Sequence, residues 1–272
     1  MNLEETKQLL RTHRISPNKL LGQNFMIEST LYPKLCNYAA LSKADVVLDA
    51  GAGFGWLTRF LADKCRGVIA VEKDPQVAMV LREQVKGFNN VTVVEGDVLK
   101  AQLPSFNKAI AIPPYYLSTN LVLWFFERRV ECAVLILQKE FVARLVASVG
   151  SEEYGWLTVV TCQNAAVEFL DAVPKAMFYP QPEVDSAIVS LKPWSQKTFQ
   201  VKDQAFFVRL VKWLFTQRNK KVGKAIAPFI RDNFKLNKQD AEKLALTLPF
   251  HDRRPRELFP KDFGAITNAL SP

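Results

Sequence analysis

The chain has 272 residues, of which 49% are hydrophobic, enough to form a sizeable core in one large domain or in a large and a small one. It has no apolar signal segment and no run approaching 18 uninterrupted apolar residues, so we expect a cytoplasmic protein that is not inserted in a membrane. Four scattered cysteines and two histidines argue against a metal site and against a disulfide framework. We also expect a monomer.

The formal net charge of +9 is unevenly distributed along the chain. Residues 1–194 carry 20 Lys or Arg and 20 Asp or Glu side chains, whereas residues 195–272 carry 16 and 7. A neutral part joined to a basic end predicts a polyanionic partner, most simply a nucleic acid. The alternative explanation is that these charges only solvate helix faces.

The N-terminal part combines a helical pattern with an irregular segment. Residues 3–12 have the spacing of a short amphipathic helix. Residues 18–27 mix glycine, amides and apolar side chains without a clean period, which is typical of a loop that lies over a ligand. In this loop, Gln23 and Asn24 are candidates to hydrogen-bond a ligand carboxylate. The apolar side chains placed to cover such a ligand are Phe25 and Met26.

Residues 46–58 predict a strand, a glycine-rich turn and a helix. An apolar run ends at Asp49, glycines follow at positions 51, 53 and 55, and the next residues are apolar with a helical period. Glycines permit a tight turn and the close approach of a ligand, and the helix N-terminus offers unpaired N–H groups. The spacing differs from the dinucleotide fingerprint, and Asp49 would repel a pyrophosphate. A ligand with a cationic amino-acid end fits better, which favours S-adenosylmethionine bound at Gly51 and Gly53.

Two further apolar runs, residues 67–71 and 91–94, are predicted strands, and each is followed by an acid. Glu72 comes directly after the first strand, where its two carboxylate oxygens suit ribose hydroxyls. Asp97 comes shortly after the second, where it can accept from an adenine amine. The alternative is that each acid merely caps a helix.

A fourth predicted strand, residues 108–112, leads into two prolines and two tyrosines. Pro113 and Pro114 lock the backbone at the carboxyl end of the strand, where open α/β sheets bind their ligands. Tyr115 and Tyr116 are therefore candidates to stack on a flat substrate. Ordinary packing is the alternative role of both rings.

The rest of the first domain continues the strand-helix alternation of a doubly wound α/β sheet. Phe178 stands just ahead of two prolines in a rigid loop, where it can present its ring to a base, although a loop aromatic is more often simply packed. The predicted elements are helices at 121–130 and 138–149, a helix that opens at 154–157, and strands at 133–137, 167–173 and 187–191.

Residues 192–195 predict a domain boundary, which divides the chain into domains 1–194 and 195–272. Beyond the boundary, residues 204–215 have a helical period, prolines divide the remainder into short helices, and no strand pattern occurs. We therefore expect a small all-helical domain. Its basic cluster, predicted to bind RNA, contains Arg218, Lys220, Lys221 and Lys224.

The motifs of the chain occur in the order seen in rRNA adenine dimethyltransferases, and the chain resembles the archaeal branch of that family over nearly its whole length. The motifs that carry the resemblance are Leu21-Gly22-Gln23-Asn24-Phe25, Asp49-Ala50-Gly51-Ala52-Gly53, Val71-Glu72, Glu95-Gly96-Asp97, Pro114-Tyr115, Gln138-Lys139-Glu140, Tyr154-Gly155, Pro180-Gln181-Pro182-Glu183-Val184-Asp185-Ser186 and Gln217-Arg218-Asn219-Lys220-Lys221.

The resemblance implies a Rossmann-like, S-adenosylmethionine-dependent methyltransferase sheet with a small helical C-terminal domain. The activity that it implies is dimethylation of two adjacent adenosines near the 3′ end of small-subunit rRNA in ribosome biogenesis, with this rRNA or a pre-30S particle as the partner. By position, the residues implied to line the S-adenosylmethionine site are Gln23, Asn24, Met26, Gly51, Glu72, Asp97 and Val98.

One position departs from the family. Members usually have Asn, then Leu or Ile, then Pro-Tyr at the end of the fourth strand, whereas this chain has Ile112-Pro113-Pro114-Tyr115. An adenine amine is a poor nucleophile because its lone pair is delocalised into the ring, so two acceptors must hold its hydrogens. The asparagine oxygen is one of them in the family, and Ile112 cannot replace it. The carbonyl of Pro113 is left to act alone, which predicts slow methyl transfer.

Two other functions stay open from the sequence. The first is a non-catalytic RNA-binding ribosome-assembly factor that keeps the methyltransferase fold and the cofactor pocket. The second is a small-molecule methyltransferase, which the basic C-terminal domain disfavours.

Overall fold

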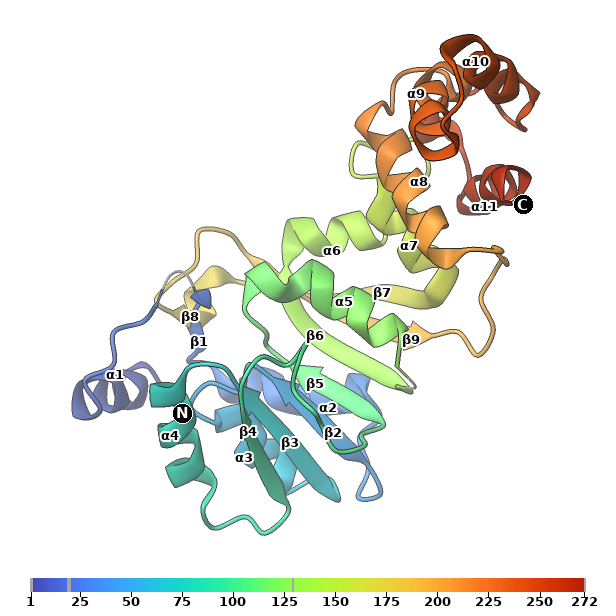
Figure 1. Ribbon diagram of the computed structural model, residues 1–272. Helices are drawn as coiled ribbons and strands as arrows, with labels where there is room; N and C mark the ends of the chain where they lie inside the picture. Colours follow the sequence, from blue (N-terminus) through green and yellow to red (C-terminus); the bar gives the residue numbers. More distant parts are fainter. Residues whose placement is uncertain (1, 19–20, 129, 272) are drawn as a thin grey trace. The chain divides into compact units, whose positions relative to one another are not determined.

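The computed structural model describes residues 2–18, 21–128 and 130–271 (Figure 1). Lys19 and Leu20, which belong to the loop predicted over a ligand, lie outside these residues. No helix in the described part of the chain is long and apolar enough to cross a membrane.

The chain folds into two compact units, each with segments from two parts of the sequence. The sheet unit contains Met1–Val142 and Val167–Pro193, and the helical unit contains Ala143–Ala166 and Trp194–Pro272. Residues 143–166, assigned to the first domain in the sequence analysis, group with the helical unit. The cause is visible at Tyr154, which is 1% exposed and whose hydroxyl donates to the carbonyl of Leu258 at 2.7 Å.

The sheet unit is built on seven strands in the order β4-β3-β2-β5-β6-β9-β7. Strands β4, β3, β2, β5 and β6 are parallel, and β9 is antiparallel to β6. Parallel strands with both faces covered need continuous apolar runs rather than alternation, which is the pattern of β2, β3, β5 and β6. The bounds are β2 Val46–Ala50, β3 Gly67–Glu72, β4 Val91–Glu95, β5 Lys108–Ala111, β6 Cys132–Gln138, β7 Ala165–Val173 and β9 Ser186–Pro193.

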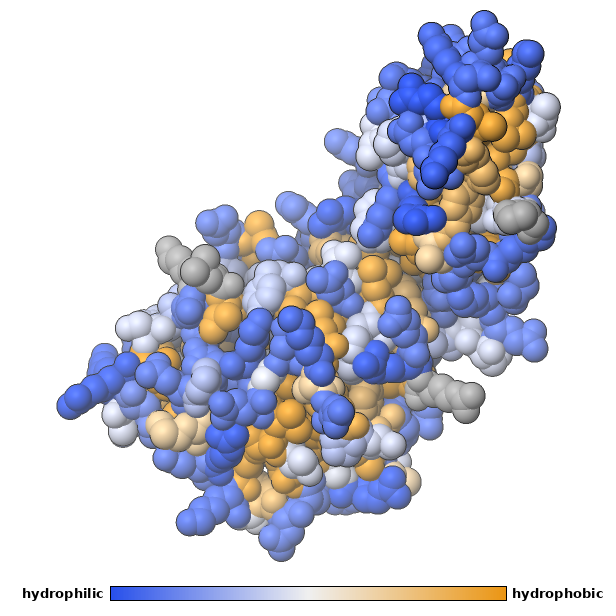
Figure 2. Space-filling model, viewed as in Figure 1, coloured by the Kyte–Doolittle hydropathy of each residue, from blue (hydrophilic) through white to orange (hydrophobic). Residues whose placement is uncertain are grey.

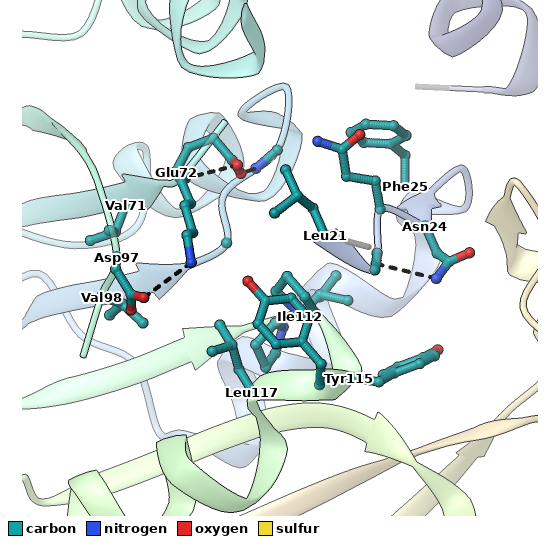
Figure 3. A pocket seen from close by; sticks show the side chains of 18 of the residues that line it. Leu21, Asn24, Phe25, Val71, Glu72, Asp97, Val98, Ile112, Tyr115 and Leu117 are labelled. Atoms are coloured by element: carbon teal, nitrogen blue, oxygen red, sulfur yellow. Dashed lines mark hydrogen bonds and ion pairs between the residues drawn. The ribbon is translucent and has the colours of Figure 1, made fainter. Parts of the chain in front are cut away.

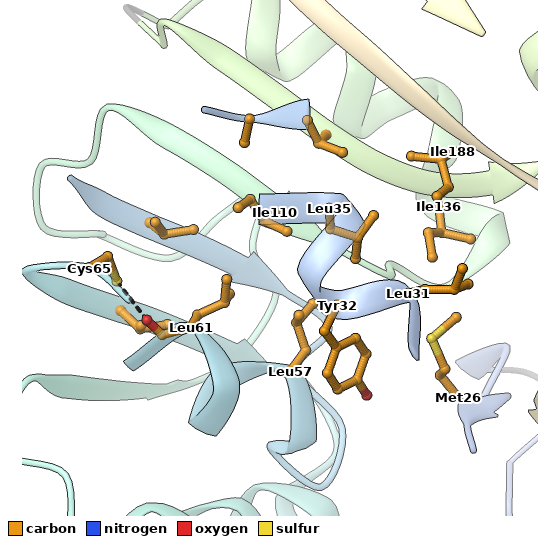
Figure 4. Packing of buried hydrophobic residues seen from close by; sticks show 14 of the residues in the cluster. Met26, Leu31, Tyr32, Leu35, Leu57, Leu61, Cys65, Ile110, Ile136 and Ile188 are labelled. Atoms are coloured by element: carbon orange, nitrogen blue, oxygen red, sulfur yellow. Dashed lines mark hydrogen bonds between the residues drawn. The ribbon is translucent and has the colours of Figure 1, made fainter. Parts of the chain in front are cut away.

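Helices connect the strands and bury their apolar sides against the sheet. In the core cluster of Figure 4, Tyr32 and Leu35 of α2 pack with Leu57 of α3 and with Ile110 and Ile136 of the sheet. Helix α2 was not predicted from the sequence, because two buried residues in a seven-residue helix are too few to show a period. The helices are α1 Leu3–Thr12, α2 Tyr32–Tyr38, α3 Trp56–Ala62, α4 Pro75–Val85, α5 Ser118–Phe126 and α6 Lys139–Leu145.

A two-stranded sheet replaces part of two predicted loops. Strand β1 (Phe25–Met26) pairs antiparallel with β8 (Phe178–Tyr179). The Phe25 ring also stacks on Phe54, with ring centroids 4.3 Å apart. Strands of two residues give no periodic signal, and their partners are far apart in the sequence, so neither was predictable. The pairing joins the loop predicted over the cofactor to the loop predicted to hold a base.

The helical unit contains α7 Trp156–Asn164, α8 Gln204–Thr216, α9 Val222–Phe234, α10 Lys238–Thr247 and α11 Pro260–Leu270. Asp203 caps α8 by accepting from the N–H of Phe206 at 2.9 Å, and Asn237 caps α10 in the same way. Within residues 195–271 no strand is formed, as the sequence analysis predicted.

Candidate active site

The turn between β2 and α3 lies against the residues that follow β5. Gly51 has a φ of +79°, a conformation that side chains rarely permit. A Cβ added there would lie 2.7 Å from Cδ of Pro114. Glycine is therefore required both by the backbone conformation and by the close approach, and the turn and the proline segment form one continuous wall.

Glu72 is fixed at the carboxyl end of β3 by three backbone N–H groups. Gly53 donates to Oε2, and Lys73 and Asp74 donate to Oε1, each at 2.9 Å. Burial raises the pKa of the Glu72 carboxyl, and the three donors oppose that rise. The N–H of Gly53 therefore orients Glu72, whose remaining lone pairs can accept from ligand hydroxyls.

Asp97 follows β4 and forms an ion pair with Lys73, whose Nζ lies 3.2 Å from Oδ2. Burial acts to raise the pKa of Asp97, but the N–H of Leu99 and the Lys73 ammonium outweigh it, so the pKa is lowered. Asp97 is consequently an ionised acceptor at neutral pH.

One pocket with a volume of about 60 Å³ collects nearly all the predicted site residues (Figure 3). Asp97 and Val98 lie on one side of it, and Asn24 and Tyr115 lie on the opposite side. The predicted residues that line it are Gln23, Asn24, Gly51, Gly53, Glu72, Asp97, Val98, Ile112, Pro113, Pro114, Tyr115, Tyr116 and Phe178.

The pocket is narrow because side chains enter it. Leu21 projects into the middle of the site, between Glu72 and Ile112 (Figure 3). Pockets for small molecules usually measure about 300–1,000 Å³, so a nucleoside-sized ligand requires the side chains of Leu21 and Lys73 to move aside.

The Gln23 side chain lines the pocket, but both ends of its amide are engaged. Nε2 donates to Oδ2 of Asp74 at 2.7 Å, and Oε1 accepts from the N–H of Asn18 at 2.7 Å. In this structure Gln23 thus links Asn18 to Asp74 at the start of α4, a different task from the ligand contact predicted from the sequence.

A second cavity, of about 50 Å³, shares Asn24 and Ile112 with the pocket. Met26, predicted for the cofactor site, lines this cavity and not the pocket. Asp49 also lines it, is 1% exposed, and accepts from the hydroxyl of Thr58 at 2.7 Å. Burial raises the pKa of Asp49 to about 7, although the Thr58 hydrogen bond acts to lower it.

Tyr115 and Tyr116, both predicted to stack on a substrate, have different surroundings. The Tyr115 hydroxyl lies 2.6 Å from Oγ of Ser186, and its ring is half-buried. Tyr116 is 47% exposed. Burial raises the pKa of its phenol, and the charges of Lys73 and Asp97 act on that pKa with opposite signs. Tyr116 therefore lies near the acids, whereas Tyr115 lies across the pocket from them.

Ile112 is half-buried one residue beyond β5, where it lines both cavities and packs against the core cluster of Figure 4. Its side chain offers no hydrogen-bond acceptor. The Pro114 carbonyl accepts from the N–H of Leu117 at 3.0 Å, while no described residue donates to the Pro113 carbonyl. The Pro113 carbonyl is thus the backbone acceptor available beside Ile112.

The predicted RNA-binding residues divide into two kinds. Lys220, Lys221 and Lys224 are exposed around the start of α9. The Arg218 guanidinium is half-buried and donates to the backbone carbonyls at positions 151 and 152, at 3.0 and 2.9 Å. Arg218 thus ties two segments of the helical unit together.

Two arginines that the sequence analysis did not single out join these lysines. The N–H groups of Val222 and Gly223 donate to the carbonyls of Arg253 and His251, at 2.7 and 2.8 Å. These bonds place Arg253 and Arg254, both exposed, beside the start of α9. The paired arginines are visible in the sequence, but only the fold shows where they lie. We call this set the basic surface: Lys220, Lys221, Lys224, Arg253 and Arg254.

The sheet has five parallel strands and an antiparallel one, a glycine turn after β2, and acids at the carboxyl ends of the neighbouring strands β3 and β4. These features define a Rossmann-like methyltransferase fold. Residues 15–248 match the family model described as ribosomal RNA adenine dimethylase. The chain belongs to this family, which confirms the fold, the family and the enzyme class predicted from the sequence.

Relatives and solved structures agree with this assignment. A probable ribosomal RNA small subunit methyltransferase A from Methanosarcina barkeri is 34% identical over 266 residues, covering 97% of this chain and 91% of the relative. A dimethyladenosine transferase from Plasmodium falciparum superposes with a TM-score of 0.78 at 26% identity, covering 89% and 95% of the two chains. The 23S rRNA methyltransferase ErmE gives a TM-score of 0.67 at 27% identity, covering 91% and 99%.

Proposed function

We propose that this protein transfers methyl groups from S-adenosylmethionine to two adjacent adenosines near the 3′ end of small-subunit rRNA, slowly because of Ile112. The observation that carries the proposal is a single pocket in which Glu72 and Asp97 lie with Pro113 and Tyr115. The basic surface supports a polyanionic partner, and the names of the relatives support small-subunit rRNA.

The residues present match the polar groups of S-adenosylmethionine. Glu72 is a fixed acceptor for ribose hydroxyls, Asp97 for an adenine amine, and Asp49 for the ammonium of the amino-acid end. Leu21 and Lys73 enter the pocket through rotatable side chains, so room can be made without moving the sheet. When bound, S-adenosylmethionine supplies an electrophilic methyl group.

The target adenine has aromatic surfaces on the other side of the pocket. Tyr115 lines this site and is half-buried, so its ring can offer a face to a base, whereas Phe178 lines the site but is 3% exposed and packs in the core cluster. The Pro113 carbonyl can accept one hydrogen of the target amine. A non-catalytic assembly factor is the second candidate function, favoured by Ile112, whose side chain offers no other acceptor.

Mass spectrometry of adenosines from small ribosomal subunits, incubated with the protein and S-adenosylmethionine, tests the proposal. Methylated adenosines near the 3′ end of the rRNA are the expected result. Tight binding to the subunits without any methylated adenosine would favour the assembly factor instead.

Glu72→Gln is expected to weaken S-adenosylmethionine binding about tenfold, or ~1.5 kcal/mol, because one carboxylate oxygen becomes an amide nitrogen that cannot accept. Isothermal calorimetry measures the change. Glu95→Gln is the matched control, since Glu95 ends the neighbouring strand, is exposed and pairs with Arg82 outside the pocket. Equal affinities for all three proteins would contradict the assignment of Glu72.

Cofactor affinity is expected to rise about tenfold between pH 6 and pH 8. The Asp49 carboxyl has a pKa raised to about 7, so it is mostly protonated at pH 6 and mostly ionised at pH 8, and only the ionised form attracts an ammonium. The rise should disappear in Asp49→Asn. A pH dependence that survives this substitution would show that another group controls binding.

A further inference from the structure

A groove of about 480 Å³ lies between α9 and α10 in the helical unit, and the active site does not use it. Its apolar lining consists of Pro228 and Leu246, which are exposed, and of Ala227 and Ala241, which are buried beneath them. Leu246 is the large aliphatic side chain of this lining and is 61% exposed. On the face seen in Figure 2, the helical unit shows apolar surface bordered by hydrophilic side chains.

Gly223, near the start of α9, lies close to Leu246 of α10 and to His251, which follows α10. A Cβ added to Gly223 would lie 3.3 Å from the carbonyl oxygen of His251 and 3.5 Å from Cδ2 of Leu246. Gly223 also connects the groove to the basic surface, since its N–H donates to the His251 carbonyl beside Arg253.

Cations dominate the rim of the groove. Lys224, Arg231 and Lys238 line it with one acid, Glu242, and all four are exposed. Arg231 pairs with Asp232 at 2.9 Å, but an exposed pair is weak and can be exchanged for a phosphate contact.

One backbone carbonyl among the residues that line the groove lacks its usual helical donor. Pro228 lies inside α9 and has no N–H to donate to the carbonyl of Lys224, four residues earlier. Both residues line the groove. An exocyclic amine of a nucleobase is a suitable donor for that carbonyl.

We propose that this groove binds one unpaired nucleotide of the rRNA, separate from the target adenosine. The base lies on the apolar surface, and its amine donates to the Lys224 carbonyl. The flanking phosphates lie on the basic surface, of which Lys224 is the member that also lines the groove. The volume suits one nucleotide, and the cations that line the groove favour a polyanionic partner. The inference rests on the RNA partner of the proposed function.

Fluorescence anisotropy tests this with two labelled RNA hairpins, one fully paired and one with a single bulged cytidine, which carries an amine but is not an adenosine. The unmodified protein is expected to bind the bulged hairpin at least about tenfold more tightly. Leu246→Asp should reduce this preference below about twofold. Phe259→Asp is the matched control, because it adds the same charge at a 55% exposed apolar residue outside the groove and should keep the preference.

A preference that survives in Leu246→Asp, or that is absent from the unmodified protein, would overturn the proposal. Thermal melting verifies that both variants fold. Methylation of small-subunit rRNA is measured separately, so the two proposals fail in different ways. Methylation without any preference for the bulge would overturn the groove alone, and a groove-dependent preference without methylation would overturn the catalytic function alone.

Discussion

Replacing Ile112 with asparagine is expected to raise the single-turnover rate of methyl transfer to small-subunit rRNA by about one to three orders of magnitude. The amide oxygen would join the Pro113 carbonyl beside Tyr115, so that both hydrogens of the target amine are held and its lone pair is aimed at the methyl group. This acceptor acts on the transition state, and cofactor affinity should change little. Mass spectrometry of rRNA adenosines at timed intervals measures the rate.

Ile112→Val is the matched control, because it alters the side chain without adding an acceptor and should leave the rate low. Ile112 packs against the core, so the melting temperature of the asparagine variant must be followed alongside its rate. Full dimethylation at ordinary speed by the unmodified protein would contradict the prediction. The sufficient acceptors would then be the Pro113 carbonyl and the Asn24 amide oxygen. No described residue donates to this oxygen, while the amide nitrogen donates to the Gly22 carbonyl at 3.3 Å.

The parts of the site that were predictable from the sequence are those determined by short stretches of neighbouring residues. The apolar run, the glycines and the acids of residues 46–97 follow from strand burial and turn conformation, and the structure brings Gly51, Glu72 and Asp97 together as the topology requires. The proline segment after β5 was predictable for the same reason, because the carboxyl ends of parallel strands meet at one edge of the sheet.

The features that could not be predicted depend on contacts between distant segments. The pairing of β1 with β8, the bonds from Gln23 to Asp74 and Asn18, and the placement of Arg253 beside α9 have no periodic signal. The role of Arg218 also depends on a distant contact. A basic cluster in the sequence does not reveal that one of its guanidinium groups donates to backbone carbonyls at positions 151 and 152.

Replacing Lys220 and Lys221 with alanine is expected to weaken binding to structured rRNA by about one to two orders of magnitude at 0.1 M salt. Each phosphate contact that is lost removes about 0.9 from the slope of log affinity against log salt, because fewer counterions are released on binding. Both side chains are exposed on the basic surface, so folding should be retained. Affinities at several salt concentrations give the slope, and cofactor binding should be unchanged because the pocket lies in the sheet unit.

Two comparisons make the result specific to the basic surface. Lys243→Ala combined with Lys261→Ala removes the same charge from exposed sites elsewhere on the helical unit, and should leave the slope nearly unaltered. Arg218→Ala should instead lower the melting temperature, because the guanidinium no longer joins the 151–152 segment to the end of α8. The Lys220/Lys221 and Lys243/Lys261 double variants could instead change the slope equally. In that case the attraction comes from the overall charge of the helical unit, and the residues around the start of α9 make no particular contact with the rRNA backbone.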